Sequence, residues 1–171
     1  MSLTFVVDPP LTAALEEEIV ALWVAVTNAG GPVGFVGPVT AEDVRPTAAA
    51  AFAGVAEGVD HLVAGFEGGR LVAMLFAVDN RFGLKGHWRV LKRVMVLPGS
   101  QGRGYGAAVM GAAAELGRGR GWSGLQVTVR DGHGLDGFYA RLGYREVGRI
   151  PGALRVGPGD DRDELFMWRD L

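Results

Sequence analysis

Residue types that often carry enzyme chemistry are absent or scarce in this chain of 171 residues. It contains no cysteine, which excludes disulfides, thiolate metal ligands and a cysteine nucleophile. None of its serines stands in the context of a nucleophile elbow, so a serine hydrolase is not expected. Its histidines are far apart and lack paired ligand spacing, so no metal is expected. The serines are Ser2, Ser100 and Ser123, and the histidines are His61, His87 and His133.

An excess of positive charge and long apolar runs are also absent. The formal net charge is −2, so nucleic acid has no general electrostatic attraction to the chain. No apolar run is long enough to span a membrane, and residues 1–10 lack the basic and apolar regions of a signal peptide. Hydrophobic residues make up 49% of the chain, as in folded proteins. We therefore expect one cytoplasmic domain over residues 1–171, with neither nucleic acid nor a membrane as partner.

The chain does contain many short apolar runs that are separated by glycines. Their periodicity predicts the order β-α-α-β-β-β-α-β-α-β-β, a mixed α/β sheet around one core. Strands are expected at residues 3–7, 61–66, 70–78, 88–97, 125–129, 144–150 and 165–168. Helices are expected at residues 12–27, 41–56, 107–116 and 135–142. The run at residues 88–97 is apolar on both faces, which suits a central strand.

The most informative segment is a glycine-rich turn at residues 101–106, Gln-Gly-Arg-Gly-Tyr-Gly, between a predicted strand and a predicted helix. The first turn of a helix leaves backbone N–H groups without internal partners and carries partial positive charge. Glycines allow a phosphate to come close to those groups. A few charge-assisted hydrogen bonds, each about 1.5–3 kcal/mol, could hold a pyrophosphate without a metal. The segment therefore predicts an anion site.

Two known phosphate-binding patterns can be compared with this turn. A Walker A loop requires Gly-Lys-Ser/Thr before its helix, whereas this helix opens with Gly-Ala-Ala. The dinucleotide fingerprint G-x-G-x-x-G/A is matched by Gly102, Gly104 and Ala107, with Asp131 after the next strand. However, three predicted strands precede the strand that leads into the motif, and little sequence follows it. An NAD(P)-binding reductase fragment therefore stays only as an alternative.

A third pattern, Gln/Arg-x-x-Gly-x-Gly/Ala, is matched by Gln101, Gly104 and Gly106 after a Val-x-Pro at residues 96–98. A second motif, Phe-Tyr-Ala-Arg-Leu-Gly-Tyr, follows at residues 138–144. Together, over about residues 60–150, the chain resembles the GNAT superfamily of N-acetyltransferases. Arg-Asp-Gly-His at residues 130–133 is also similar to the tabtoxin-resistance acetyltransferases.

The resemblance implies a fold and a co-substrate. The fold would be α/β, with a mixed, mostly antiparallel central sheet and helices on both faces. The co-substrate would be acetyl-coenzyme A, with no metal: pantetheine would lie along the central strand and the pyrophosphate on the glycine turn. An N–H group near Met95 or Val96 would face the thioester oxygen. The expected coenzyme A residues are Val94, Met95, Val96, Gln101, Gly102, Arg103, Gly104, Tyr105 and Gly106, although Arg103 could equally be a solvated loop arginine.

The resemblance implies the catalytic residues only in part. Tyr139 matches the tyrosine that protonates the departing thiolate, although a purely structural core tyrosine is the alternative. No base is implied, because Lys92 stands where many members carry glutamate and Gly132 where they carry asparagine. The candidates are His133, Asp131, Asp79, His87 and a chain of water molecules. We take His133 as the first candidate, because imidazole titrates near neutral pH.

The expected activity is transfer of an acetyl group to the primary amine of a small molecule by direct attack. A non-catalytic acyl-coenzyme A-binding protein is an alternative from another class. Residues 157–164, which include Asp160, Asp161, Asp163 and Glu164, are expected to form an acidic turn. This turn either attracts a cationic amine or is only solvated surface. The long loop at residues 28–39, with Phe35, is either functional or a plain surface loop. The sequence leaves the acceptor and the oligomeric state, a homodimer included, open.

Overall fold

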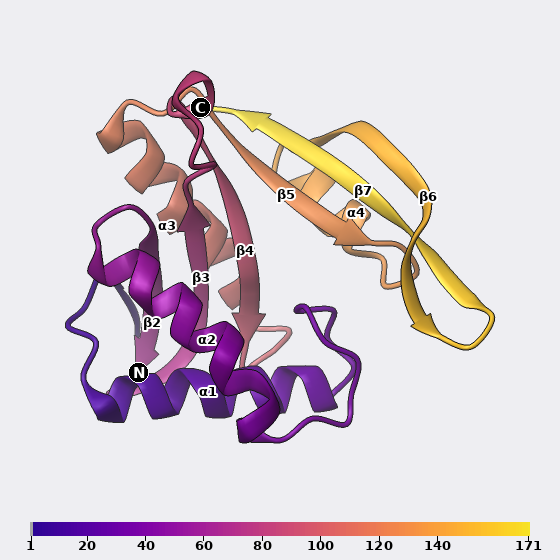
Figure 1. Cartoon of the computed structure of the whole chain (residues 1–171). Helices are drawn as coiled ribbons and strands as arrows, with labels where there is room; N and C mark the ends of the chain where they lie inside the picture. The colour runs from indigo at the N-terminus through magenta and orange to yellow at the C-terminus, as the bar shows by residue number, and fades with distance from the viewer. Residues whose placement is uncertain (1) are drawn as a thin grey trace.

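The structure of the chain, a computed structural model, describes residues 2–171 as a seven-stranded sheet with helices on both faces (Figure 1). The strands are β1 (Leu3–Val7), β2 (His61–Glu67), β3 (Arg70–Val78), β4 (Trp88–Val96), β5 (Gly124–Arg130), β6 (Arg145–Gly157) and β7 (Asp160–Asp170). The helices are α1 (Ala13–Asn28), α2 (Ala41–Ala56), α3 (Tyr105–Arg120) and α4 (Leu135–Arg141), with a short 3-10 helix at Gly83–Lys85. No helix within residues 2–171 is long and apolar enough to cross a membrane.

The strand order is β1-β2-β3-β4-β5-β7-β6, and β4 and β5 form the one parallel pair in the described sheet. The predicted element order and the mixed, mostly antiparallel sheet are confirmed, and β4 is the central strand as expected. The dinucleotide-binding alternative is wrong, because that fold needs successive parallel βαβ units around its glycine turn.

Expected capping residues begin the first two helices. Thr12 accepts a hydrogen bond from the Leu15 N–H at 3.2 Å at the start of α1. Thr40 and Asp43 form a capping box on α2, with the Thr40 N–H donating to the Asp43 carboxylate at 2.8 Å. Local sequence signals are therefore enough to begin both helices.

Helix α3 differs from its prediction, because it begins at Tyr105 and passes through Gly117 and Gly119 to Arg120. A Cβ at Gly117 would lie 2.4 Å from the Leu171 side chain, so this glycine permits close packing and does not end the helix. Gly121, with a φ of 72°, supplies the left-handed C-cap.

The prediction of a turn at residues 157–164 is wrong for most of its length, because β6 extends to Gly157 and β7 begins at Asp160. Three of the acidic side chains form ion pairs with arginines of this hairpin. The pairs are Arg155–Asp161, Arg149–Asp163 and Arg162–Asp160. Most of the expected negative charge is therefore already paired with arginines of the same hairpin.

The sheet separates two hydrophobic cores. On β3, Leu75 faces the core beneath α3 and α4, whereas Met74 and Phe76 face the core beneath α1 and α2. Trp23 of α1 is fully buried, and its indole N–H donates to the carbonyl of Val33 at 2.9 Å. This bond fixes the chain after α1 beside the central strand, where the site lies.

Candidate active site

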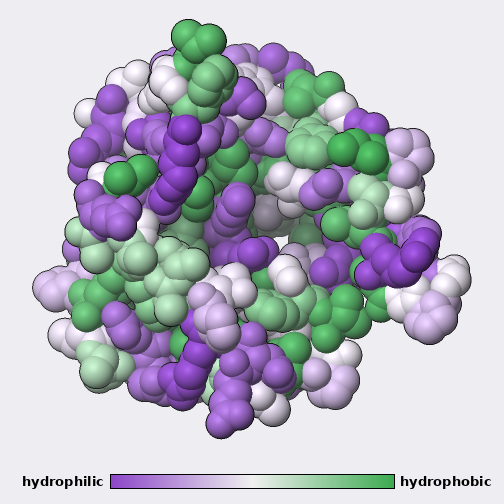
Figure 2. Space-filling view, viewed as in Figure 1, coloured by the Kyte–Doolittle hydropathy of each residue, from purple (hydrophilic) through white to green (hydrophobic). Residues whose placement is uncertain are grey.

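The site is a cleft that opens where β4 and β5 separate. The parallel pairing of the two strands ends at Leu91 and Val127, and beyond these residues each strand pairs only with its other neighbour. A β-bulge at Arg93, whose φ is 54°, interrupts the register of β4 just after this point. The cleft has a volume of about 710 Å³, and hydrophilic side chains border the hollow in the surface (Figure 2).

The glycine turn forms one end of the cleft. Gly102 and Gly104 have φ values of 76° and 79°, and a Cβ on either would meet no atom within 4 Å. Their backbone is therefore open to a ligand, beside the N-terminal N–H groups of α3. Gly106 has a different role: a Cβ there would lie 3.2 Å from the Phe138 ring, so the glycine lets α3 pack against α4. The predicted residues that line this end are Gln101, Gly102, Gly104, Tyr105 and Gly106.

The edge of β4 that faces the cleft offers backbone donors. The Leu97 N–H donates to the Val72 carbonyl of β3 at 2.8 Å. Because N–H groups alternate between the two edges of a strand, the Met95 N–H also points toward β3, and those of Val94 and Val96 point into the cleft. Val94 and Val96 line the cleft, whereas the Met95 side chain is buried beneath α1 and α2. Of the two predicted thioester donors, this geometry favours Val96 over Met95.

Arg103 does not line the cleft. Its guanidinium donates two hydrogen bonds to Glu67 of β2, at 2.8 and 2.6 Å, and the Tyr105 hydroxyl donates to the same carboxylate at 2.6 Å. Arg103 first and Tyr105 second lower the pKa of Glu67 from 4.5 to about 2. In this geometry Arg103 anchors the glycine turn to the sheet and does not reach toward a phosphate.

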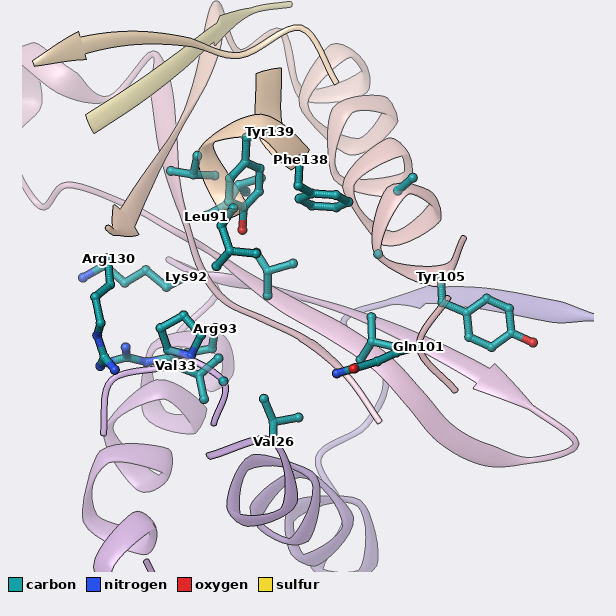
Figure 3. Close-up of a pocket in the computed structure, with 18 of the residues that line it drawn as sticks. Val26, Val33, Leu91, Lys92, Arg93, Gln101, Tyr105, Arg130, Phe138 and Tyr139 are labelled. Carbon is teal, nitrogen blue, oxygen red and sulfur yellow. The ribbon is translucent and has the colours of Figure 1, made fainter. Parts of the chain in front are cut away.

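Tyr139 enters the cleft from α4. Its ring packs edge-on against Phe138 and Tyr144, with centroid distances of 5.1 and 5.7 Å. Its hydroxyl points toward Leu91 in the cleft (Figure 3). Burial raises the pKa of Tyr139 to about 12, so the phenol keeps its proton at neutral pH and can donate it.

The structure does not bring His133 to Tyr139. His133 is exposed and lines a smaller hollow of about 250 Å³ beside the cleft. Gly132 has a φ of 101°, so an asparagine there would be strained, and its Cβ would require the Arg162 guanidinium, 2.1 Å away, to move. Within residues 2–171, no three histidine or acidic side chains are grouped to hold a metal.

The other predicted bases are also outside the cleft. Asp131 lies 3.8 Å from Arg149 and accepts a hydrogen bond from the next backbone N–H. Asp79 lies before β4, where it pairs with Arg89 at 3.0 Å. His87 immediately precedes β4, at the end where β4 and β5 still pair. Neither Asp79 nor His87 therefore reaches the opening.

Glu164 is the only carboxylate among the described residues that line the cleft. It is half-buried on β7, directly opposite Arg130 of β5. The sequence analysis counted it among the acidic residues of a turn and so missed it as a site residue. The alternation around the buried Leu165 and Met167 was the available signal, because it places Glu164 on the opposite face of a strand.

The loop after α1 and three basic side chains complete the opposite end of the cleft. Gly31, Pro32 and Val33 line it, so this loop is part of the site and not a remote surface loop. Lys92, Arg93 and Arg130 also line the cleft. Figure 3 shows these three side chains gathered at the end opposite Gln101 and Tyr105, beyond Tyr139. The sequence analysis did not identify this basic group.

Several solved structures of acetyltransferases share this fold. A ribosomal-protein-alanine N-acetyltransferase from Brucella melitensis is 17% identical, with a TM-score of 0.78 and full coverage of both chains. An acetyltransferase of the GNAT family from Streptococcus pneumoniae is 15% identical, with a TM-score of 0.77 over 98% of this chain and 100% of that chain. An N-acetyltransferase from Staphylococcus aureus is 10% identical, with a TM-score of 0.79 over 99% of both chains. At these identities the likeness establishes the fold.

The sequence itself identifies the family. Residues 37–144 match the acetyltransferase (GNAT) family, and they include the central strand, the glycine turn and Tyr139. No curated protein matches the sequence. The chain belongs to the GNAT acetyltransferase family, as its two motifs predict.

The Glu67 cluster predicts a pH-dependent contribution to stability. The folded pKa of Glu67 is below its ordinary value, so the contribution is present above about pH 4.5 and is lost as the pH falls toward about 2. Glu67→Gln should therefore lower the melting temperature near pH 7, and its difference from the parent should shrink as the pH falls below about 4.5.

Thermal unfolding of both proteins across this pH range measures the difference. The control is Glu115→Gln, which removes an exposed carboxylate paired with Arg118 and should change little at any pH. A Glu67→Gln difference that stays constant down to about pH 2.5 would contradict the assigned role.

Proposed function

We propose that the protein transfers an acetyl group from acetyl-coenzyme A to the primary amine of a small molecule by direct attack. One observation carries the proposal: a single cleft holds an open glycine turn at one end, the hydroxyl of the buried Tyr139 in the middle, and Glu164, its one carboxylate among residues 2–171, on the strand position opposite Arg130. Between them runs a strand edge with unpaired backbone donors. The parts that acyl transfer needs are therefore in one place.

The residues present fit the co-substrate. The open backbone of Gly102 and Gly104, with the N-terminus of α3, suits a pyrophosphate. The exposed β4 edge suits the extended amides of pantetheine, which would pair with it as an added strand. The Val96 N–H is a donor for the thioester oxygen. Acetyl-coenzyme A supplies the acyl group and a thiol leaving group when it is bound.

Two side chains of the cleft would then transfer the protons of the reaction. The amine nitrogen forms a bond to the acyl carbon while the carbon–sulfur bond breaks. Glu164 accepts the proton that the amine loses, directly or through water, and Tyr139 donates a proton to the departing thiolate. Backbone N–H groups stabilise negative charge on the carbonyl oxygen. Glu164 then loses its proton to solvent and Tyr139 regains one from solvent, so the reaction yields one amide and one thiol and both side chains are restored.

Incubation with acetyl-coenzyme A and a panel of primary amines tests the function. The expected result is thiol release matched by an N-acetylated amine in the mass spectrum. Binding of acetyl-coenzyme A with no thiol release from any amine would instead identify the non-catalytic alternative.

Gly104→Val tests the phosphate site. A β-branched side chain resists the φ of 79° and occupies the open space in front of the turn, so coenzyme A affinity should fall at least about 10-fold. Calorimetric titration measures the affinity. The matched control is Gly121→Val, which introduces a similar strain at a φ of 72° at the other end of α3. Equal coenzyme A affinity in the two variants would refute the assignment.

Tyr139→Phe removes the donor and keeps the ring. The turnover number should fall about 10- to 1000-fold with coenzyme A affinity nearly unchanged, because the interaction is made in the transition state. Tyr144→Phe is the control, because this neighbouring hydroxyl is buried, has no hydrogen-bond partner in the described part of the chain and does not line the cleft. A turnover number that is unchanged when chemistry limits the rate would return Tyr139 to a purely structural role.

Glu164→Gln tests the base. It keeps the shape of the side chain but cannot take up a proton, so kcat should fall about 100-fold near neutral pH. The remaining activity should rise with pH as more amine becomes neutral in solution. Steady-state kinetics over a pH series measures both effects, with Glu115→Gln as an exposed control. Kinetics identical to the parent would leave water as the proton acceptor.

A further inference from the structure

The end of the cleft beyond Tyr139 carries an imbalance of charge. Lys92, Arg93 and Arg130 line it, and Glu164 is the one carboxylate there among the described residues. None of the three cations takes part in any ion pair found within residues 2–171. Other arginines of the chain do have carboxylate partners, as Arg89 and Arg103 show. The other lysines and arginines without an ion pair within residues 2–171 do not line the cleft, so this end is where unpaired positive charge faces it.

Arg93 is held in place by packing. Its guanidinium lies over the Trp23 ring, 5.2 Å from the centroid, and the loop after α1 covers it so closely that a Cβ at Gly34 would lie 2.3 Å from its Nη1. Its backbone is in the left-handed region at the bulge of β4. Burial lowers the pKa of Arg93, and no carboxylate within residues 2–171 forms an ion pair with it. A desolvated cation of this kind is stabilised by an anion.

Arg130 is in a similar position on β5. Its guanidinium donates one hydrogen bond, at 3.2 Å, to the Phe35 carbonyl, which leaves most of its donors unused. Burial first, and the charge of Arg162 second, lower the pKa of Arg130. Arg162 itself pairs with Asp160. Thr27 lines the adjoining small hollow, and its buried hydroxyl, which can donate or accept, has no hydrogen-bond partner within residues 2–171. Arg130 therefore keeps guanidinium donors that a ligand in the cleft could use.

These cations lie away from the expected phosphate site. The glycine turn is at the opposite end of the cleft, and the Tyr139 hydroxyl lies between the two ends (Figure 3). Since the acyl group is expected near Tyr139, the basic end is where an acceptor would approach. Its charges should therefore complement the acceptor and not coenzyme A.

Resting on the proposed function, we propose that the acceptor is an amine that also carries an oxyanion, a carboxylate or a phosphonate. Arg93 and Arg130 bind the oxyanion, and Glu164 faces the amine. A planar guanidinium can make two parallel hydrogen bonds to such a group, which fixes its orientation as well as its charge. This reverses the cationic acceptor that the acidic residues 157–164 suggested, because those aspartates are already paired with arginines.

Matched pairs of acceptors test the proposal. Free amino acids, their carboxamides and aminoalkylphosphonates of equal length are compared by kcat/KM with acetyl-coenzyme A. The parent should prefer an acid to its carboxamide by about 10- to 100-fold, and the best of the two acid types identifies the oxyanion. Arg130→Gln and Arg93→Met should each reduce this preference about 10-fold or more, with coenzyme A affinity unchanged.

The preference is a ratio, so it does not depend on how much of a variant is folded. Arg118→Gln is the control, because it removes an exposed arginine of α3 outside the cleft and should keep the full preference. If Arg93→Met does not fold, Arg93→Lys and Arg130→Gln still report on the same end of the cleft. A loss of coenzyme A affinity in the Arg130 variant would assign the cations to the co-substrate and overturn the proposal.

The remaining outcomes separate this proposal from the proposed function. Equal kcat/KM for acids and carboxamides overturns the acidic acceptor while acetyl transfer stands. If no amine is acetylated, the proposed function fails, and calorimetry on the coenzyme A-loaded protein decides the anion site. If acids bind more tightly than carboxamides and Arg130→Gln removes this difference, the anion site is supported. If both bind equally, or neither binds, the anion site is overturned.

Discussion

The cleft depends on one interruption in the sheet, the loss of hydrogen bonding between β4 and β5 beyond Leu91 and Val127. A strand edge inside a folded protein must find partners for its N–H and C=O groups in water or in a ligand. Separation of the two strands therefore creates space and supplies a row of donors in the same step. Both strands stay rigid because β3 and β7 continue to pair with their outer edges.

Ion pairs decide which charges remain available for a ligand. Glu67 accepts hydrogen bonds from the guanidinium of Arg103 and the hydroxyl of Tyr105. These bonds anchor the glycine turn to the sheet and leave the backbone of the turn open. The aspartates of the β6–β7 hairpin form ion pairs with three other arginines. Lys92, Arg93, Arg130 and Glu164 are left in the cleft. The net charge of −2 gives no indication of this distribution, because it depends on which partners the fold brings together.

Much of the fold could be predicted because its signals are local. The periods of apolar residues set the order of helices and strands, and Thr12 and Thr40 begin two helices through bonds to residues three positions on. The predictions of helix ends and turns were wrong where a residue type is explained by a contact with a residue distant in the sequence. Gly117 is a glycine because Leu171 packs against it, and the acidic run at the start of β7 is a strand because arginines of β6 face it.

By itself, the sequence determined the GNAT family, the glycine turn and the position of Tyr139, since each is written in a few contiguous residues. Only the tertiary structure decided that Val96 rather than Met95 points its N–H into the cleft, that Arg103 is taken by Glu67, and that His133 lies outside. Only the tertiary structure brought Arg93, Arg130 and Glu164 together from three strands. The physical reason is that charge complementarity and burial depend on distances across the sheet. The sequence around a residue does not indicate which distant residues will lie next to it in the folded chain.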